Sequence, residues 1–170
     1  MRRFGSGYES NLGEQKLLIP RVYIDTSVVG GYFDEEFSEH SQRLFCEFTL
    51  GRLQAVLSSV TIEEVERSPA RVRALLHQPP LIHAERVSLN DEAITLAEEY
   101  VHEGIVTASH RVDARHIAIA TICRVDVLVS WNFEHVVKLY RIRAFNSVNL
   151  RLGYPQLEIR SPREVCHEET

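Results

Sequence analysis

The sequence predicts an α/β protein, a three-layer α/β/α sandwich built on a mainly parallel sheet of about four or five strands. Short apolar runs rich in β-branched residues alternate along the chain with segments whose apolar residues recur at helical spacing. Strands that alternate with helices form parallel sheets covered on both faces. Length and composition agree, because 170 residues with 44% hydrophobic and 25% charged residues are typical of one soluble globular domain.

The beginning of the chain is expected to supply a leader, the first strand and the first long helix. Residues 1–20 carry Gly, Ser and Asn without periodicity, so we interpret them as a loose leader and place a single domain at 21–166. RVYID, residues 21–25, is β-branched and aromatic and follows a proline, as a buried strand would. Residues 38–50 repeat apolar side chains every three or four positions before a glycine, which predicts a helix.

The middle of the chain alternates strand and helix again. QAVLSS, residues 54–59, is a second strand that continues into a short helix, TIEEVERS, at 61–68. A helix at 70–77 ends at a proline pair, and residues 84–89 are either a short strand or an extended link. A strong helix with a regular apolar stripe runs over 91–102 and ends at a glycine.

The last third is predicted to hold the most buried helix and two more strands. Residues 112–123 are nearly continuous in apolar residues along one side, so this helix is well buried. VDVLVS, residues 125–130, is a strand, and NFEHVVKLY, residues 132–140, is interpreted as a helix that follows at once. Residues 142–152 are also expected to be helical, and residues 157–162 give a last strand.

Composition excludes several classes of protein. A net charge of −5 argues against a nucleic-acid-binding protein that relies on a bulk basic surface, but not against a nuclease whose acidic site is neutralised by metal ions. The first residues lack the apolar stretch of a signal peptide, and no apolar run approaches the roughly 18 to 20 residues of a membrane span. Three scattered cysteines suggest neither a disulfide framework nor a zinc site, so we expect a cytoplasmic protein.

Two acidic residues stand where the first two strands end. Asp25 closes the first strand, where a metal ligand belongs, although an Asp there also serves as a helix cap. Glu64 lies in the first turn of the helix after the second strand. It also fits a capping box with Thr61, and Glu63 competes with it for a functional role. Helical geometry favours Glu64, because Glu63 points roughly 100° away from the face shared by Val60 and Glu64.

Two more oxygen-bearing residues stand in the second half of the chain. Asp113 opens the buried helix; the helix dipole alone would favour it there, but its helical face is buried, where an unpaired carboxylate is costly. Asn132 follows the strand at 125–130 and fits an N-cap of the next helix equally well. Three carboxylates at one sheet edge would repel each other unless a divalent cation held them. Oxygen ligands of this kind suit Mg²⁺ or Mn²⁺.

Three segments of the sequence resemble the signature blocks of PIN-domain nucleases, above all the VapC-like toxins of toxin–antitoxin systems. They are VYIDTSVVGGYFD, LSSVTIEEVERSP and DARHIAIATICRVDVLVSWNFEHV, and the resemblance covers nearly the whole chain. It implies a PIN-like fold and metal binding by Asp25, Glu64 and Asp113, the residues already selected. The family's fourth acidic position corresponds to Asn132, which departs from the pattern and implies a weaker second metal site. The resemblance also implies an antitoxin partner and a homodimer.

Further side chains near these positions are candidates for substrate contact. Thr26 and Ser27 follow Asp25 and can donate to a phosphate or a metal-bound water while capping the turn. Arg115 can clamp a phosphate, or form a surface ion pair instead. His116, His40 and His135 can contact substrate, although helical histidines on or near a core are more often structural.

The function predicted from the sequence is a Mg²⁺- or Mn²⁺-dependent endoribonuclease acting on single-stranded RNA. Asp25, Glu64 and Asp113 hold the metal, which activates a water for attack on the phosphodiester, with Asn132 in a weaker position. One alternative is a non-catalytic RNA-binding or protein-interaction module that lost activity with its fourth acid. Another is a phosphatase with Asp25 as nucleophile, which usually requires a second Asp two residues later, where Ser27 stands.

Overall fold

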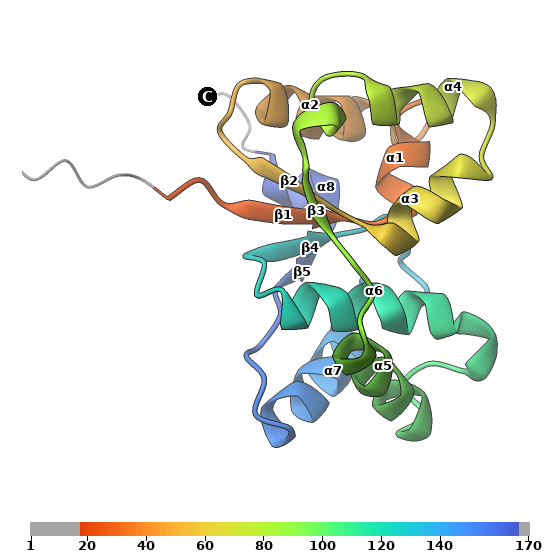
Figure 1. The fold of residues 1–170 in the computed structure, drawn as a ribbon, viewed down its shortest axis with the longest axis vertical. Helices are drawn as coiled ribbons and strands as arrows, with labels where there is room; N and C mark the ends of the chain where they lie inside the picture. Colours follow the sequence, from red (N-terminus) through yellow and green to blue (C-terminus); the bar gives the residue numbers. More distant parts are fainter. Residues whose placement is uncertain (1–17, 167–170) are drawn as a thin grey trace, which may run out of the picture.

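The computed structural model describes residues 18–166 of the chain, so most of the predicted leader at 1–20 lies outside the described residues. One sheet of five strands, all parallel, occupies the centre (Figure 1). The strands are β1 Arg21–Ile24, β2 Gln54–Ser58, β3 Glu85–Val87, β4 Val127–Val129 and β5 Ile159–Arg160.

Helices cover both faces of the sheet, which confirms the predicted three-layer α/β/α architecture (Figure 1). Helices α1, α2, α4 and α8 pack on one face, and α5, α6 and α7 pack on the other; α3 contributes to both layers. The α-helices are α1 Thr26–Gly31, α2 Ser38–Thr49, α3 Ser59–Glu66, α4 Ala70–Ala74, α5 Asp91–His102, α6 Arg111–Ile122, α7 Leu139–Arg151 and α8 Pro162–Val165. Short 3₁₀ turns are formed by Leu75–His77, Leu81–His83 and Ala108–His110.

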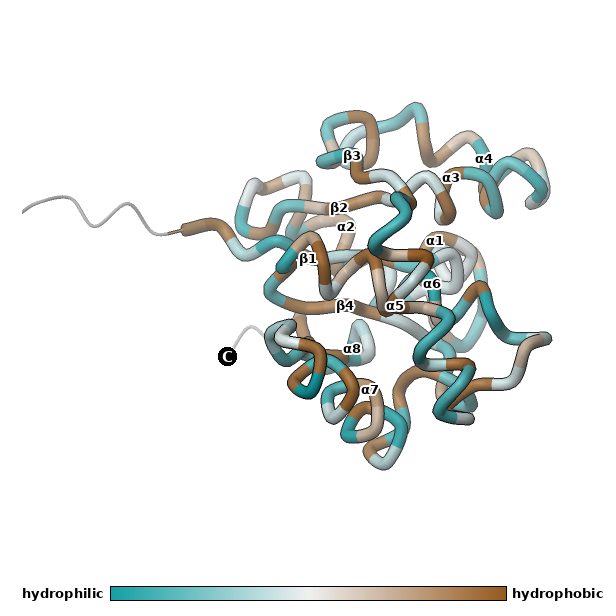
Figure 2. The backbone as a smooth tube through the Cα atoms, turned by 60° about the horizontal axis from the view of Figure 1, so that its bottom comes forward, coloured by the Kyte–Doolittle hydropathy of each residue, from teal (hydrophilic) through white to brown (hydrophobic). Residues whose placement is uncertain are grey.

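Two hydrophobic clusters, one on each face, hold the layers together. Successive strand residues point to opposite faces, so Tyr23 and Leu128 enter the cluster under α5, α6 and α7, while Ile24 and Val129 enter the other. These side chains are fully buried, and Figure 2 shows β1 and β4, with their apolar residues in brown, at the centre of the molecule. Each Val or Leu removed from water in this way stabilises the fold by about 1.5 to 3 kcal/mol.

The strand order β3–β2–β1–β4–β5 creates a switch point beside β1. From β1 the chain adds β2 and β3 on one side, then returns through α5 and α6 to place β4 and β5 on the other side (Figure 1). Strands β1 and β4 are therefore neighbours whose following loops diverge. In open parallel sheets, ligands bind in the crevice outside the carboxyl ends of such strands. Asp25 follows β1 directly, and Asn132 follows β4 after two residues.

The predicted helix at 132–140 is wrong. Residues 132–138 form turns, and α7 begins only at Leu139. The reason lies at Asn132, whose side-chain Oδ1 accepts a hydrogen bond from the backbone N–H of His135 and whose carbonyl accepts from those of Val136 and Val137. These bonds close a compact turn, and extended backbone at Lys138 separates that turn from α7.

The other predicted helices and strands are present, but the strands are shorter and the helix predicted at 61–68 is shifted, because α3 spans Ser59–Glu66. The short helices α1 and α8 were not predicted. Strand β4 covers 127–129 of the predicted 125–130, and β5 covers only 159–160 of 157–162. The alternative left open for 84–89 resolves as strand β3. Among residues 18–166, no helix is long and apolar enough to cross a membrane.

Candidate active site

Asp25 is buried at the carboxyl end of β1 and is fixed by three donors. It caps α1, and its Oδ1 accepts hydrogen bonds from the Ser27 hydroxyl at 2.5 Å and the Val28 backbone N–H at 3.3 Å. Its Oδ2 accepts from the hydroxyl of Ser130, which follows β4, at 2.5 Å. The Asp25 carboxylate therefore caps α1 and also lies at the candidate site. Its bond to Ser130 joins the end of β1 to the end of β4.

Glu64 is held by side chains from two other elements. Its Oε2 accepts a hydrogen bond from Thr26 Oγ1 of α1 at 2.5 Å and lies 2.8 Å from Nε2 of His116 of α6. The predicted capping box with Thr61 is wrong, because α3 begins at Ser59 and the Ser58 side chain caps it by accepting from the Thr61 N–H. Ser58 stands three residues earlier than the predicted cap and leaves Glu64 free for tertiary contacts.

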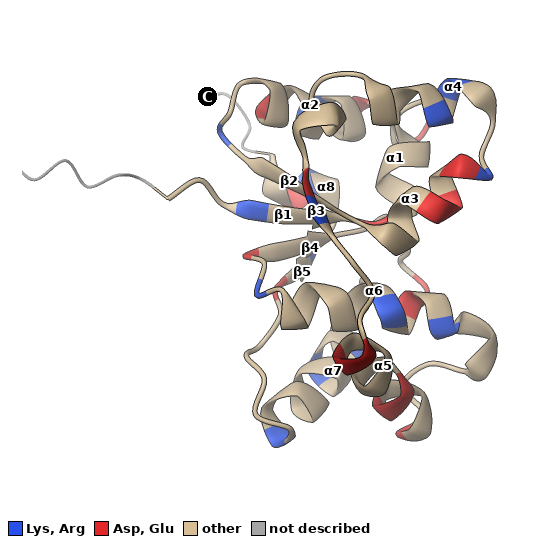
Figure 3. Cartoon of the chain, viewed as in Figure 1, with Lys and Arg blue, Asp and Glu red and all other residues tan. Residues whose placement is uncertain are grey.

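Glu63 is excluded from the site by helical geometry, as the sequence predicts. Its carboxylate forms an i,i+4 ion pair with Arg67 at 2.7 Å, and both side chains are more than 60% exposed. Figure 3 shows acidic positions on α3 and near the start of α6 at the same end of the molecule, where β1 and β4 end.

Asp113 and Asn132 face each other across the switch point. Asn132 Nδ2 donates to Asp113 Oδ1 at 3.3 Å, and the Asn132 backbone N–H donates to Ser130 Oγ at 2.9 Å. Because Ser130 also donates to Asp25, one hydrogen-bonded chain links Asp25, Ser130, Asn132 and Asp113. This chain connects residues from β1, the segment after β4, and α6.

The electrostatics of the three carboxylates differ. Burial raises the pKa of Asp25 and outweighs the opposing effects of His116 and of the hydrogen bonds from Ser130 and Ser27. Burial likewise raises the pKa of Asp113, with a further contribution from the charge of Asp25. Burial also acts to raise the pKa of Glu64, but hydrogen bonds from His116 and Thr26 outweigh it, so this pKa is lowered.

Asp25 and Asp113 are thus coupled carboxylates, while Glu64 belongs to a separate hydrogen-bonded group. Among the described residues, no three His, Cys, Asp or Glu side chains lie close enough together to hold a metal ion as they stand. The three predicted ligands come from the loops and helices at one edge of the sheet, and their assignment as ligands stays a prediction.

The donor set has the chemistry of a hard-cation site. All four predicted ligands offer oxygen, which Mg²⁺ and Mn²⁺ prefer. Within residues 18–166, no side chain or backbone group donates a hydrogen bond to Glu64 Oε1 or Asp113 Oδ2, although each carboxylate has its other oxygen bound. Carboxylates with one oxygen held and the other open are suited to a divalent cation, so the chemistry of these donors, although not their present spacing, fits the metal that the sequence implies.

The predicted substrate contacts are mostly engaged inside the protein. Thr26 donates to Glu64, Ser27 donates to Asp25 and accepts from the Trp131 N–H at 2.9 Å, and His116 is only 4% exposed. Arg115 is half-buried on α6, and its Nε has no hydrogen-bond partner among the described side chains and backbone groups. The substrate roles of all four stay predictions.

Sequence reasoning missed Ser130, Tyr23 and Ser58. Ser130 follows β4 directly, so the strand-end rule could have selected this residue, although not its bond to Asp25. Tyr23 Oη lies 2.6 Å from His116 Nδ1 and 2.7 Å from Ser58 Oγ. No local sequence pattern predicts the contact between Tyr23 and His116, because the two residues are 93 positions apart.

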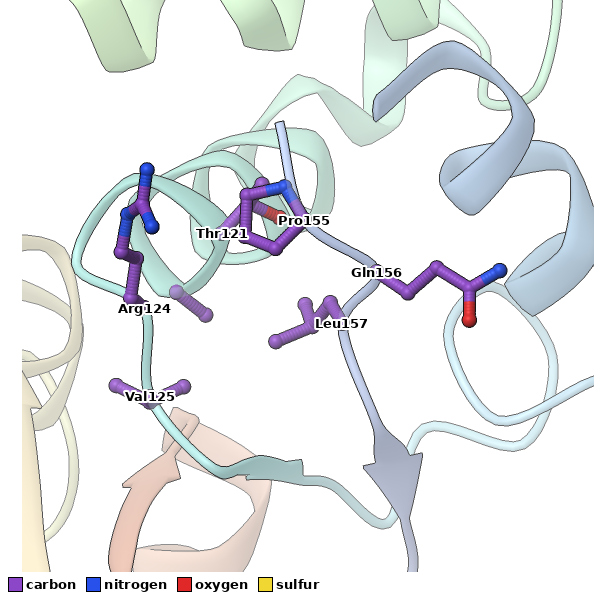
Figure 4. A pocket seen from close by; sticks show the side chains of 7 residues that line it. Thr121, Arg124, Val125, Pro155, Gln156 and Leu157 are labelled. Carbon is purple, nitrogen blue, oxygen red and sulfur yellow. The ribbon is translucent and has the colours of Figure 1, made fainter. Parts of the chain in front are cut away.

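A separate hollow of about 170 Å³ lies at the opposite edge of the sheet (Figure 4). It opens where α6 ends and just before β4 and β5 begin, between Arg124, Val125 and Leu157. The acidic residues follow the strands instead, so this hollow is not part of the candidate active site.

The chain matches no protein-family model and no curated protein sequence. It is similar in structure to VapBC2 from Rickettsia felis bound to a promoter DNA fragment, with TM-score 0.54 and 13% identity over 83% of this chain and 98% of the other. It is also similar to FitAcB from Neisseria gonorrhoeae, with TM-score 0.54 and 12% identity over 85% and 99%.

A third similar structure is VapC20 from Mycobacterium tuberculosis, described as a Sarcin–Ricin loop cleaving toxin. Its TM-score is 0.51 at 14% identity over 67% of this chain and 92% of that one. The chain therefore has a PIN-like α/β fold. This is the fold that the three sequence segments predict.

Proposed function

We propose that the chain is a metal-dependent endoribonuclease that cleaves single-stranded RNA, and that it is the toxin of a toxin–antitoxin pair. The observation that carries this proposal is the placement of Asp25, Glu64 and Asp113 around the β1–β4 switch point of a PIN-like fold. A similarly folded protein described as a Sarcin–Ricin loop cleaving toxin supports the choice of activity.

Asp25, Glu64 and Asp113 would hold a Mg²⁺ or Mn²⁺ ion, with Asn132 in a weaker position. A divalent ion bound there supplies an activated water and stabilises charge on the departing oxygen. The protein contributes the orientation of the ligands: Ser27 and Ser130 fix Asp25, and the Asn132 amide holds one oxygen of Asp113.

The reaction requires no covalent intermediate. The attacking water loses a proton to solvent and forms a bond to phosphorus, while the bond between phosphorus and the 3′ oxygen breaks and that oxygen takes up a proton, so the products carry a 5′ phosphate and a 3′ hydroxyl. Arg115 lies on the same helix as Asp113, and we propose that its guanidinium contacts a substrate phosphate. The other charged side chains of the site are acidic, so the phosphate backbone requires such a cation or the metal itself.

The proposed partners are a protein antitoxin and a second copy of the chain, in the cytoplasm. Support for the antitoxin comes from similar structures described as a toxin–antitoxin complex from Klebsiella pneumoniae and as FitAB bound to DNA. Large apolar side chains exposed on and beside α7 are consistent with a protein interface; they are Leu139, Tyr140, Leu150 and Leu152. Light scattering of the purified chain tests the dimer, with a monomer mass contradicting it.

A second candidate is a non-catalytic RNA-binding or protein-interaction module. Two points favour it: Asn132 stands where the resemblance implies a fourth acid, and the described carboxylates are not gathered into a metal-holding group as they stand. This candidate predicts RNA binding without cleavage at any Mn²⁺ concentration.

The test is incubation of a mixed RNA pool with the purified chain, with and without Mn²⁺, followed by mapping of the new ends. The nuclease proposal predicts cuts only with metal, and fragments with 5′ phosphates and 3′ hydroxyls. Fragments that end in 2′,3′-cyclic phosphates would overturn the water-attack mechanism, and intact RNA at every metal concentration would favour the binding module.

A further inference from the structure

The Glu64 carboxylate is bound on one oxygen only. Both of its side-chain partners, Thr26 Oγ1 and His116 Nε2, meet Oε2, at 2.5 Å and 2.8 Å. Within residues 18–166, Oε1 receives no hydrogen bond. Two donors on one oxygen fix the rotation of the carboxylate and leave the other oxygen available as a ligand.

His116 is itself held by a buried network. Its ring is 4% exposed, its Nδ1 lies 2.6 Å from Tyr23 Oη, and the two rings meet edge to face with centroids 5.8 Å apart. Tyr23 is fully buried and also contacts Ser58 Oγ at 2.7 Å. The line Ser58–Tyr23–His116–Glu64 therefore joins β2, β1, α6 and α3, and it ends at a predicted metal ligand.

Both ring nitrogens of His116 are engaged. The Tyr23 hydroxyl donates to Ser58 Oγ, and its oxygen lies 2.6 Å from Nδ1, while Nε2 lies 2.8 Å from Glu64 Oε2. Because an ionised carboxylate only accepts hydrogen bonds, Nε2 is the donor in the contact with Glu64.

The position of His116 connects all three predicted ligands. Beyond its hydrogen bond to Glu64, His116 acts to lower the pKa of Asp25 and of Asp113, and its ring lies one turn of α6 from Asp113. A histidine with a purely structural role in the core needs no contact with a carboxylate at the edge of the site. His116 makes such a contact, between its Nε2 and Glu64.

We propose that His116 is a positioning residue for the metal centre: its Nε2–H, held by Tyr23, fixes Oε2 of Glu64 and presents Oε1 to a divalent cation. This inference rests on the metal site of the function proposed above. Hydrogen bonds to metal ligands typically change metal affinity by about 10- to 100-fold when removed. His116 acts through Glu64 and does not touch the reacting atoms.

The test is calorimetric titration of the full-length protein with Mn²⁺, which needs no RNA. His116→Ala should weaken Mn²⁺ binding by about 10- to 100-fold. His116→Gln keeps an N–H donor at the distance of Nε2 and should restore most of the affinity. Tyr23→Phe removes only the hydroxyl that supports the ring and should give a smaller loss than His116→Ala.

Tyr100→Phe is the matched control. Tyr100 is a fully buried tyrosine in the same hydrophobic cluster as Tyr23, and its hydroxyl donates to Asn149, away from the acidic residues. Removal of that hydroxyl should lower the melting temperature without changing Mn²⁺ affinity. If His116→Ala does not fold, the comparison of Tyr23→Phe with Tyr100→Phe decides the question.

The outcomes separate this inference from the proposed nuclease. Equal Mn²⁺ affinity in wild type and His116→Ala, or an equal loss in Tyr100→Phe, overturns the role of His116 alone. A wild type that binds no Mn²⁺ overturns the metal site together with this inference. The expected affinities without any RNA cleavage support the positioning role and overturn the nuclease.

Discussion

Gly31 packs against the tryptophan that precedes Asn132, and its replacement by alanine gives a quantitative prediction. A Cβ at this position would lie 2.9 Å from Ser41 Oγ and 2.9 Å from two atoms of the Trp131 indole. The indole cannot withdraw easily, because its N–H donates to Ser41 at 2.8 Å and Phe37 stacks on it with centroids 4.5 Å apart. Overpacking of this kind costs about 1 to 3 kcal/mol.

Gly30 is the matched control, because a Cβ there meets no atom within 4 Å in the same short helix. Gly30→Ala should therefore gain up to about 1 kcal/mol from helix propensity. Gly31→Ala has the same gain set against the overpacking cost, which leaves a net loss of up to about 2 kcal/mol and makes it about 1 to 3 kcal/mol less stable than Gly30→Ala. Urea unfolding in chelator measures both variants, with an unchanged m-value as the sign of intact two-state behaviour. Equal stability of the two variants would refute the packing argument.

Three further predictions concern the acidic residues. Asp113→Asn should stabilise the metal-free protein at neutral pH, because burial raises the pKa of Asp113 and so penalises its charge. The gain should shrink as the pH falls from the raised folded-state pKa toward about 3.9, and vanish below it, where the folded and unfolded carboxyls are both protonated; melting curves that show no such pH dependence would contradict it. Glu64→Gln should lose Mn²⁺ binding in calorimetry, while Glu63→Gln keeps it and changes stability by less than about 0.5 kcal/mol, since its ion pair is exposed; equal affinities would remove Glu64 from the site. Asn132→Asp should lower the Mg²⁺ concentration for half-maximal cleavage and lower the melting temperature in chelator, because a carboxylate replaces the amide that donates to Asp113. A variant that needs as much metal as wild type would leave Asn132 as a turn cap only.

Much of the fold could be predicted because its signals are local. β1 and β2 are short β-branched runs, and the apolar period of α5 and α6 follows from burial of one helical side. The helix predicted at 132–140 was wrong for a reason that is also local. Apolar residues at helical spacing occur in a helix and in a compact turn alike, and here the Asn132 side chain closes the turn.

The candidate site could be predicted only as far as the strand-end rule reaches. That rule selected Asp25 and Asn132, and helix geometry separated Glu64 from Glu63. The partners of these residues could not be predicted, because contacts such as Ser130 with Asp25 join positions 105 residues apart. Their formation depends on the strand order, which places β4 beside β1.

Cleavage of a labelled single-stranded RNA by chelator-treated protein, before and after Mn²⁺ is added back, tests the central claim most directly. The wild type should be inactive in chelator and recover activity with Mn²⁺. Asp25→Asn should be inactive in both conditions, because a neutral amide replaces one of three charged ligands. Wild-type cleavage that persists in chelator, or an Asp25→Asn variant that cleaves at the wild-type rate, would contradict a metal-dependent nuclease built on these carboxylates.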